Sequence, residues 1–180
     1  MTKASTLKTI DYLAFLSKEI YTPCGMELNN ICLSPESTEY QACTYQLNHK
    51  PIMGRMAKIT PQKIGQFVTL WKRTEQGTTT PFTDGDNIDL FVINVQYNSQ
   101  HGQFVFPRSV LLEQGIITGD KRQGKRGFRV YPAWDHPINS TAKKTQKWQL
   151  EYFLTIRLNF KTDLHRVRKL FANGITASTD

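Results

Sequence analysis

The sequence predicts a single α+β domain, in which one central β-sheet, mostly antiparallel or mixed, carries helices on a face or at an end. Three observations lead to this prediction. A chain of 180 residues has room for one hydrophobic core. Segments with strand periodicity fill its middle, and segments with helical periodicity lie mainly at its two ends. The two kinds of segment do not alternate as they do in parallel α/β folds. The domain is expected to span residues 1–175, followed by a loose tail over 176–180.

The first half of the chain predicts one helix and then a series of strands. Apolar residues recur near helical spacing from Thr6 to Tyr21, and Pro23 with Gly25 ends that helix. Alternating or apolar segments then predict strands, and the turn at 48–51 joins the first two into a hairpin. The fourth is nearly all apolar and is expected at the centre of the sheet. The predicted strands cover residues 40–47, 52–59, 66–73 and 88–97.

The second half predicts shorter elements and two further helices. A strand at 103–106 leads to Pro107, which opens a short helix that ends at Gly115. A glycine-rich basic hairpin is expected between 116–117 and 128–131. A long helix should begin at Ser140 or Thr141 and reach about residue 157, and the last helix should run from 162 or 163 to 173–174.

Composition and charge disfavour a membrane-spanning or secreted protein and favour one that binds a polyanion. The net charge of +8 favours a polyanionic partner, although it also serves solubility. No segment approaches the ~18 apolar residues of a membrane span, and charged residues near the N-terminus exclude a secretory signal, so we expect a cytoplasmic protein. The three cysteines, Cys24, Cys32 and Cys43, lack zinc-site spacing and are expected to be reduced and largely buried.

Two basic segments stand out as candidate binding sites. Residues 55–73 contain five Lys or Arg and no acidic residue, and residues 121–134 contain five more, which together are ten of the chain's 23. Cations interleaved with aromatic rings suit a nucleic acid, because the charges meet phosphates while the rings stack on bases. The candidate contacts are Arg55, Lys58, Lys63, Trp71, Lys72, Arg73, Lys125, Arg126, Arg129 and Trp134.

Strand alternation adds a condition on Arg55 and Lys58. Successive side chains of a strand point to opposite faces, so these two cations lie on opposite sides of the predicted strand 52–59. One of them therefore faces the covered side, where a charge normally needs a paired anion. Either a carboxylate lies beside that cation, or the face is an open functional surface.

Two other functions remain open at this point. Asp86 and Asp89, which lie before the central strand, could hold Mg²⁺ and, with Glu39 and Lys58, form a metal-dependent nuclease. The next strand offers no acid and no lysine, and aspartates also cap turns. No other cofactor is expected, and no metal ligands are assigned. A protein-binding or small-ligand-binding domain is the second alternative.

A series of short motifs occurs in order along the chain: Ala57–Arg73, Pro81-Phe82, Asp86, Gly102–Pro107, Gly124–Pro132 and Gln146–Gln149. Together these motifs resemble the MepB-like family of bacterial proteins. The resemblance implies a fold similar to restriction-endonuclease-like domains. That fold implies nucleic-acid binding, with DNA favoured over RNA. The namesake is encoded beside a drug-efflux pump, which implies a link to drug resistance for the ligand-binding alternative.

Overall fold

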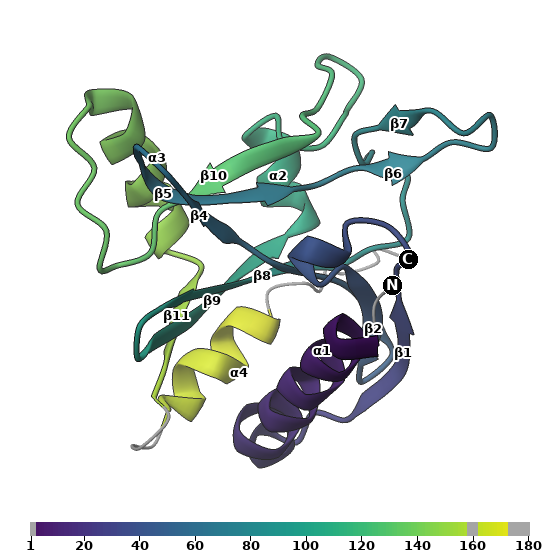
Figure 1. Ribbon diagram of the computed structural model, residues 1–180, viewed down its shortest axis with the longest axis vertical. Coiled ribbons are helices and arrows are strands. Elements are labelled where there is room, and N and C mark those ends of the chain that lie inside the picture. The colour runs from purple at the N-terminus through teal and green to yellow at the C-terminus, as the bar shows by residue number, and fades with distance from the viewer. Residues whose placement is uncertain (1–2, 158–161, 173–180) are drawn as a thin grey trace, which may run out of the picture.

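A six-stranded mixed sheet lies at the centre of the fold in this computed structural model, which describes residues 3–157 and 162–172 (Figure 1). The strand order is β1-β2-β3-β8-β9-β11, and only the β3–β8 pair is parallel. This arrangement confirms the predicted α+β class and the central position of the apolar strand. The strands are β1 (Leu28–Leu33), β2 (Cys43–Leu47), β3 (Lys50–Met56), β8 (Leu90–Tyr97), β9 (Gln100–Pro107) and β11 (Phe153–Ile156).

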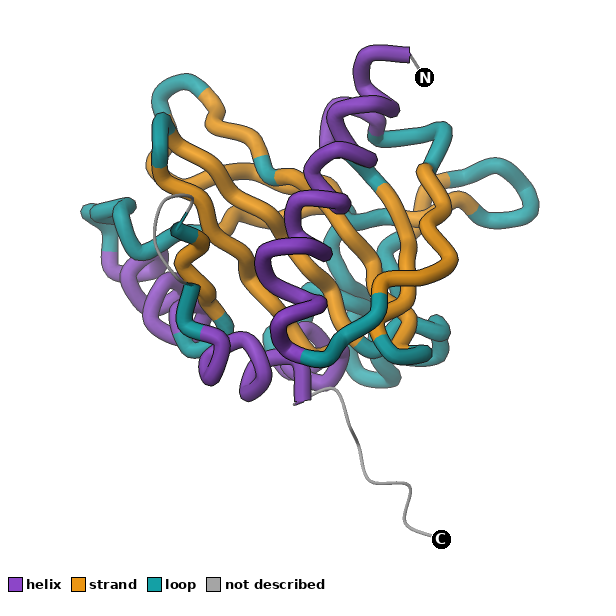
Figure 2. The backbone as a smooth tube through the Cα atoms, turned by 90° about the horizontal axis from the view of Figure 1, so that it is seen from below, coloured by secondary structure: helices purple, strands orange, loops and turns teal. Residues whose placement is uncertain are grey.

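Two helices cover one face of this sheet, α1 (Lys3–Leu16) and α4 (Leu164–Ala172). The α1 helix runs across the strands in Figure 2. Its Leu13 and Leu16 are buried, as are Leu170 and Phe171 of α4, and they pack with apolar side chains of β2, β3 and β8. Burial of these side chains supplies the hydrophobic free energy that holds both helices to the sheet.

The predicted first helix is confirmed and has an irregular end. After α1, the chain continues through a π-helical turn, Ser17–Tyr21, and a 3₁₀ turn, Thr22–Cys24. Gly25 ends the 3₁₀ turn with φ of 74°, a left-handed conformation that glycine adopts without steric cost. The π turn brings Ile20 and Tyr21 into the core, where both are fully buried.

A three-stranded sheet lies over the opposite face, together with α2 (Arg108–Glu113) and α3 (Ser140–Leu150). Its strand order is β10-β5-β4, all antiparallel. Val68 and Val130 are fully buried on its inner side and pack against Phe91 and Phe104 of the central sheet. The strands are β4 (Lys58–Thr60), β5 (Lys63–Thr69) and β10 (Gly127–Val130).

The chain crosses between the two sheets at Ala57, which corrects one prediction. We expected a single strand over 52–59, but β3 ends at Met56 and β4 begins at Lys58. The amide of Ala57 donates to the carbonyl of Asn94, 2.8 Å away, which is the last bond to the central sheet. Apolar alternation continues through this point, so the sequence pattern does not reveal the change of sheet.

The predicted strand 66–73 and the loop that follows it also differ in detail. β5 ends at Thr69, and the chain resumes pairing in a two-stranded ribbon of β6 (Lys72–Arg73) and β7 (Thr79–Thr80). The predicted loop 74–85 therefore contains the turn of this ribbon. The short helix after Pro107 and the glycine turn at Gly115, with φ of 59°, are as predicted.

The predicted long helix to residue 157 is wrong after Leu150. Asn139, rather than Ser140 or Thr141, caps α3 by accepting a 2.8 Å bond from the amide of Ala142. The chain then forms β11, which pairs with β9 along Phe153↔Phe104. A sheet edge needs hydrogen-bond partners, and β11 supplies them to β9. β1 lies outside all of the strands predicted from the sequence.

The predicted basic hairpin is a loop. Residues 116–117 are not a strand, and β10 pairs with β5 instead. The loop closes through a bridge between Gly119 and Arg122. The last helix is confirmed as α4, but its predicted end at 173–174, like the predicted tail 176–180, lies outside the described residues.

All three cysteines are free thiols. Cys43 is buried and Cys24 half-buried, whereas Cys32 is exposed, contrary to prediction. No helix among residues 3–157 and 162–172 has the length and apolar character to cross a membrane.

Candidate functional site

The two basic segments meet in the three-stranded sheet. Phe67 of β5 pairs with Lys58 of β4 on one side and with Arg129 of β10 on the other. Directly opposed residues in antiparallel strands project to the same face, so these three side chains form a row across the outer face. The inner face is core, because Val68 and Phe128 beside this row are buried.

Arg129 is held in a fixed position on this face. Its Nη1 donates to the carbonyl of Gly65 at 2.8 Å, and its Nη2 donates to Oγ1 of Thr60 at 2.9 Å. The guanidinium lies 6.0 Å from the ring centroid of Phe67. Two hydrogen bonds and a ring contact leave this side chain few rotamers, so its charge is presented at low entropic cost.

The other end of the row is aromatic and basic. The ammonium of Lys58 lies 5.0 Å from the ring centroid of Tyr40, and Tyr40 meets Phe67 edge to face at 6.3 Å. Lys63, at the start of β5, is exposed and pairs across the strands with Thr60. We call Tyr40, Lys58, Lys63, Phe67 and Arg129, with the adjoining loop 118–126, the basic–aromatic face.

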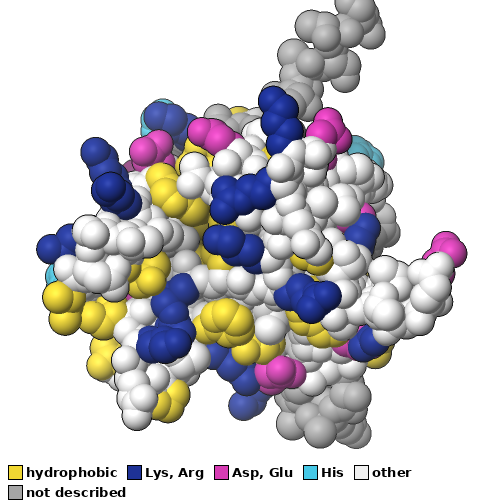
Figure 3. Space-filling model, turned by 90° about the horizontal axis from the view of Figure 1, so that it is seen from above, with side chains coloured by type: hydrophobic (Ala, Val, Ile, Leu, Met, Phe, Trp, Pro, Cys, Tyr) yellow, Lys and Arg dark blue, Asp and Glu magenta, His cyan; other side chains and the backbone are white. Residues whose placement is uncertain are grey.

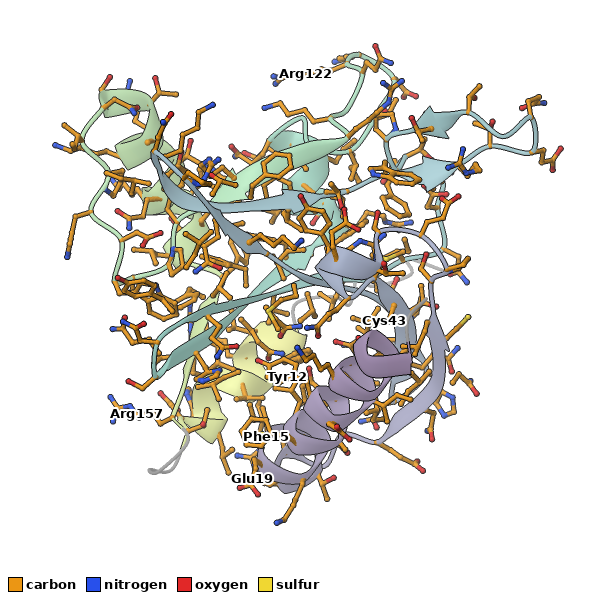
Figure 4. All side chains as sticks on the ribbon, viewed as in Figure 1. Tyr12, Phe15, Glu19, Cys43, Arg122 and Arg157 are labelled. Carbon is orange, nitrogen blue, oxygen red and sulfur yellow. The ribbon has the colours of Figure 1, made fainter. Side chains whose placement is uncertain are left out.

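The loop 118–126 extends this face and is packed in place. Gly124 approaches the backbone of 116–118 so closely that an added Cβ would lie 2.7 Å from three backbone atoms. Its amide donates to Oγ1 of Thr118 at 2.9 Å. Lys125 and Arg126 are exposed. The labelled Arg122 projects from the side of the molecule opposite Glu19 (Figure 4), and Figure 3 shows Lys and Arg gathered on this side, with the acidic side chains mainly toward its rim.

A groove of about 280 Å³ lies between the loop and α3. Lys125, Arg129 and Tyr131 contribute to its lining. Gln149 of α3 is fully buried and occupies the free edge of β10: its Nε2 donates to the carbonyl of Arg129, and its Oε1 accepts from the amide of Tyr131, at 3.0 and 2.9 Å. The helix thereby fixes the strand that carries Arg129.

Five of the predicted contacts lie elsewhere. Arg55 is 5% exposed, so it does not lie on the outer face with Lys58. Lys72 pairs with Asp86, and Arg73 pairs with Glu36 at 2.5 Å while its guanidinium lies over the ring of Trp71. Trp134 is half-buried and packs edge to face on Phe153 at 5.6 Å, against the core between the two sheets.

The predicted catalytic residues do not all lie together. Asp86 accepts hydrogen bonds from the amide and hydroxyl of Thr83 and pairs with Lys72. Asp89 lies beside Pro51 near the start of β3, while Lys58 follows the end of that strand, roughly 20 Å away at about 3.3 Å per residue. Glu39 is exposed in the 3₁₀ turn Thr38–Tyr40. Within the described parts of the chain, no three His, Cys, Asp or Glu side chains are grouped to hold a metal ion.

Sequence reasoning missed the residues that build the face around its cations. The predicted strands contain Phe67 and Tyr131 and the predicted long helix contains Gln149, but none of the three is among the predicted contacts. The sequence does carry a signal for Phe67. In the predicted strand 66–73, Phe67 lies on the face opposite Val68 and Leu70. A large aromatic ring on the face away from the core indicates a binding surface. Gln149 gives no such signal, because only its burial against β10 shows what it does.

This chain matches the model of one protein family and is similar to a solved structure. The family model described as MepB-like matches residues 34–155. A solved structure titled "Crystal Structure of MepB" shares 35% sequence identity and superposes with a TM-score of 0.71, covering 89% of this chain and 100% of that chain. No curated protein matches this chain. A similarity to restriction-endonuclease-like domains remains a prediction.

Proposed function

The chain belongs to the MepB-like family, and we propose that it binds nucleic acid, DNA in preference to RNA, through the basic–aromatic face. The observation that carries this proposal is the row Lys58–Phe67–Arg129, in which two segments some 60 residues apart in the sequence present two cations around one ring. A location in the cytoplasm, where bacterial nucleic acid lies, belongs to the same proposal.

The cations of this face fall into two kinds with different tasks. Arg129 is anchored by Gly65 and Thr60, so it offers a fixed charge that orients the partner. Lys63 and Lys125 are exposed and make no side-chain hydrogen bond or ion pair within the described residues, so they are free to follow a phosphate backbone. Phosphate contacts of this kind provide affinity without reading sequence.

Phe67 supplies the apolar part of the proposed interface. The ring is half-buried between Tyr40 and Arg129. An aromatic ring flanked by cations suits an unstacked base, and stacking of this kind contributes about 1–3 kcal/mol per base. The face is therefore expected to bind single-stranded DNA at least as well as a duplex of the same length.

Fluorescence anisotropy with labelled single-stranded DNA, duplex DNA and single-stranded RNA, each at several salt concentrations, tests the proposal. Binding should weaken linearly on a log–log plot against salt, and Lys125→Gln should reduce the slope by about 1. Phe67→Leu should weaken binding to the single strand more than to the duplex. A preference for RNA would contradict the assignment to DNA, and no binding to any probe at low salt would refute the whole proposal.

Lys18→Gln is the matched control for these charge changes. Lys18 is 84% exposed and its only ion partner among the described residues is the neighbouring Glu19, which lies on the side of the molecule opposite Arg122 (Figure 4). If binding depends only on net charge, Lys18→Gln and Lys125→Gln will weaken it equally. If it depends on the basic–aromatic face, only Lys125→Gln will do so.

A further inference from the structure

Arg55 is a buried cation that has no ion-pair partner in the part of the chain that the structure describes. Its side chain is 5% exposed, and the two hydrogen bonds it makes within the described residues both come from Nη1, to Sδ of Met53 at 2.8 Å and to the carbonyl of Gly54 at 3.0 Å. Its Nε is buried and has no hydrogen-bond partner among the described residues. The sequence predicted either a carboxylate beside the covered cation or an open functional surface. No carboxylate of residues 3–157 or 162–172 forms an ion pair with Arg55.

Arg55 is among the residues that line a cavity of about 470 Å³ between the 32–37 segment and β6. This volume lies within the range of small-molecule sites, roughly 300–1,000 Å³. The lining is mainly apolar, with Leu33, Met53, Trp71 and Phe82 among its walls. A cavity of this character accommodates the apolar body of a ligand while one polar group fixes its orientation.

The charges around the cavity leave one positive charge uncompensated. Lys72 and Arg73 also line it, but each is paired with a carboxylate, from Asp86 and Glu36 respectively. Burial lowers the pKa of Arg55 to about 10, so the guanidinium remains charged at neutral pH. The site therefore has the net charge that complements a monoanion.

We propose that this cavity binds a small monocarboxylate with an apolar, aromatic-sized body. The carboxylate lies against the Nε–Nη2 edge of Arg55, which is the edge left without hydrogen bonds and whose two parallel N–H groups match the two oxygens of a carboxylate. The apolar body lies against Trp71 and Phe82. This cavity shares no lining residue with the basic–aromatic face.

Isothermal titration calorimetry with benzoate and 2-naphthoate tests the proposal. Their neutral amides, benzamide and 2-naphthamide, have matched shapes, and phenyl phosphate replaces the carboxylate by a phosphate group. The carboxylates should bind more tightly than the amides by about tenfold or more, because a charge-assisted bidentate pair is lost in the amide. Tighter binding of phenyl phosphate than of benzoate, or equal binding of acid and amide, would overturn the monocarboxylate assignment.

Arg55→Met separates a ligand-binding role from a structural one. Removal of a buried charge that has no ion-pair partner should leave the melting temperature unchanged or raise it, while 2-naphthoate binding falls by about tenfold or more. Arg55→Lys retains the charge but lacks the two parallel N–H groups of the guanidinium, so this variant should also bind 2-naphthoate more weakly. Lys18→Met, a loss of the same charge at an exposed position, should bind as the unmodified chain does. Unchanged binding in Arg55→Met would refute the proposal even if the variant is stable.

Discussion

The side-chain amide of Gln103 on β9 donates a hydrogen bond to the hydroxyl oxygen of Tyr21, 3.1 Å away, and so ties the end of the N-terminal helix to the middle of the central sheet. The same amide donates to Oδ1 of Asn94 on β8 at 2.8 Å. Both Gln103 and Tyr21 are fully buried. Buried polar groups are costly when unpaired, so this small network fixes the register of the helix on the sheet.

Replacement of Gln103 by Leu should destabilise the fold by about 1–3 kcal/mol, because Tyr21 and Asn94 each lose a donor inside the core. Urea unfolding followed by circular dichroism measures this difference. Gln96→Leu, at an exposed position of β8, is the control and should change stability by less than about 0.5 kcal/mol. Equal effects of the two changes would show that the network contributes nothing specific.

Gly102 is required where β11 joins the central sheet. An added Cβ would lie 2.4 Å from the Phe153 ring and 3.0 Å from the carbonyl oxygen of Leu154. Gly102→Ala should therefore displace the edge strand and cost about 1–3 kcal/mol in unfolding free energy. Gly85→Ala is matched to it, since its Cβ would meet nothing closer than 3.9 Å. A thermal melt of both variants checks the prediction, which fails if they are equally stable.

Asp86 is expected to be structural. Its carboxylate joins Lys72 of β6 to the turn before β8 and also receives two bonds from Thr83. Asp86→Asn should lower the free energy of unfolding by about 1 kcal/mol, a value suited to a partly exposed ion pair. A double-mutant cycle with Lys72→Met measures the coupling between the two side chains. Zero coupling would show that the pair contributes nothing to stability.

His101 should make stability depend on pH. Partial burial lowers the pKa of His101 below its ordinary value of about 6.5, which the unfolded chain retains. Between these two values the unfolded state binds a proton that the native state does not. The contribution of His101 is therefore complete above about pH 6.5 and is lost as pH falls through the native pKa.

Urea midpoints at pH 5.5 and pH 7.5 measure this dependence. His101→Gln should reduce the difference between the two midpoints, because it removes the titrating group. His165→Gln, at an exposed position of α4, serves as control and should preserve the difference. A difference that is the same in all three chains would assign the pH dependence to other groups.

The sequence predicts some elements better than others for physical reasons. The apolar run of β8 predicts a central strand, because a strand that is buried on both faces has apolar side chains at successive positions. A strand with one face in solvent alternates between apolar and polar residues. Trp148, Tyr152 and Ile156 continue a helical spacing past the point where α3 stops, so the four-residue strand β11 is hidden in the pattern of a longer helix. β1, with Asn29 and Asn30 inside it, lacks the alternation that marks a strand.

The candidate sites show the same limit. The basic segments are visible in one dimension, but their pairing through β5 and β10 depends on contacts between distant residues. Arg55 differs from Lys58 because it is buried. Lys72 and Arg73 differ from the exposed lysines of the face because each is paired with a carboxylate. Sequence alone assigns all of them to one surface, because a charge and its partner carboxylate are far apart in the chain.

The crossing at Ala57 joins the two β-layers through one extended segment, which supplies β3 to one layer and β4 to the other. We therefore expect the two layers to unfold together. Some 60 residues of chain separate β5 from β10, so we expect this pairing to form late in folding, after the entropy of closing that loop has been overcome. An isolated peptide of residues 55–73 would therefore carry the charges of the basic–aromatic face without its shape.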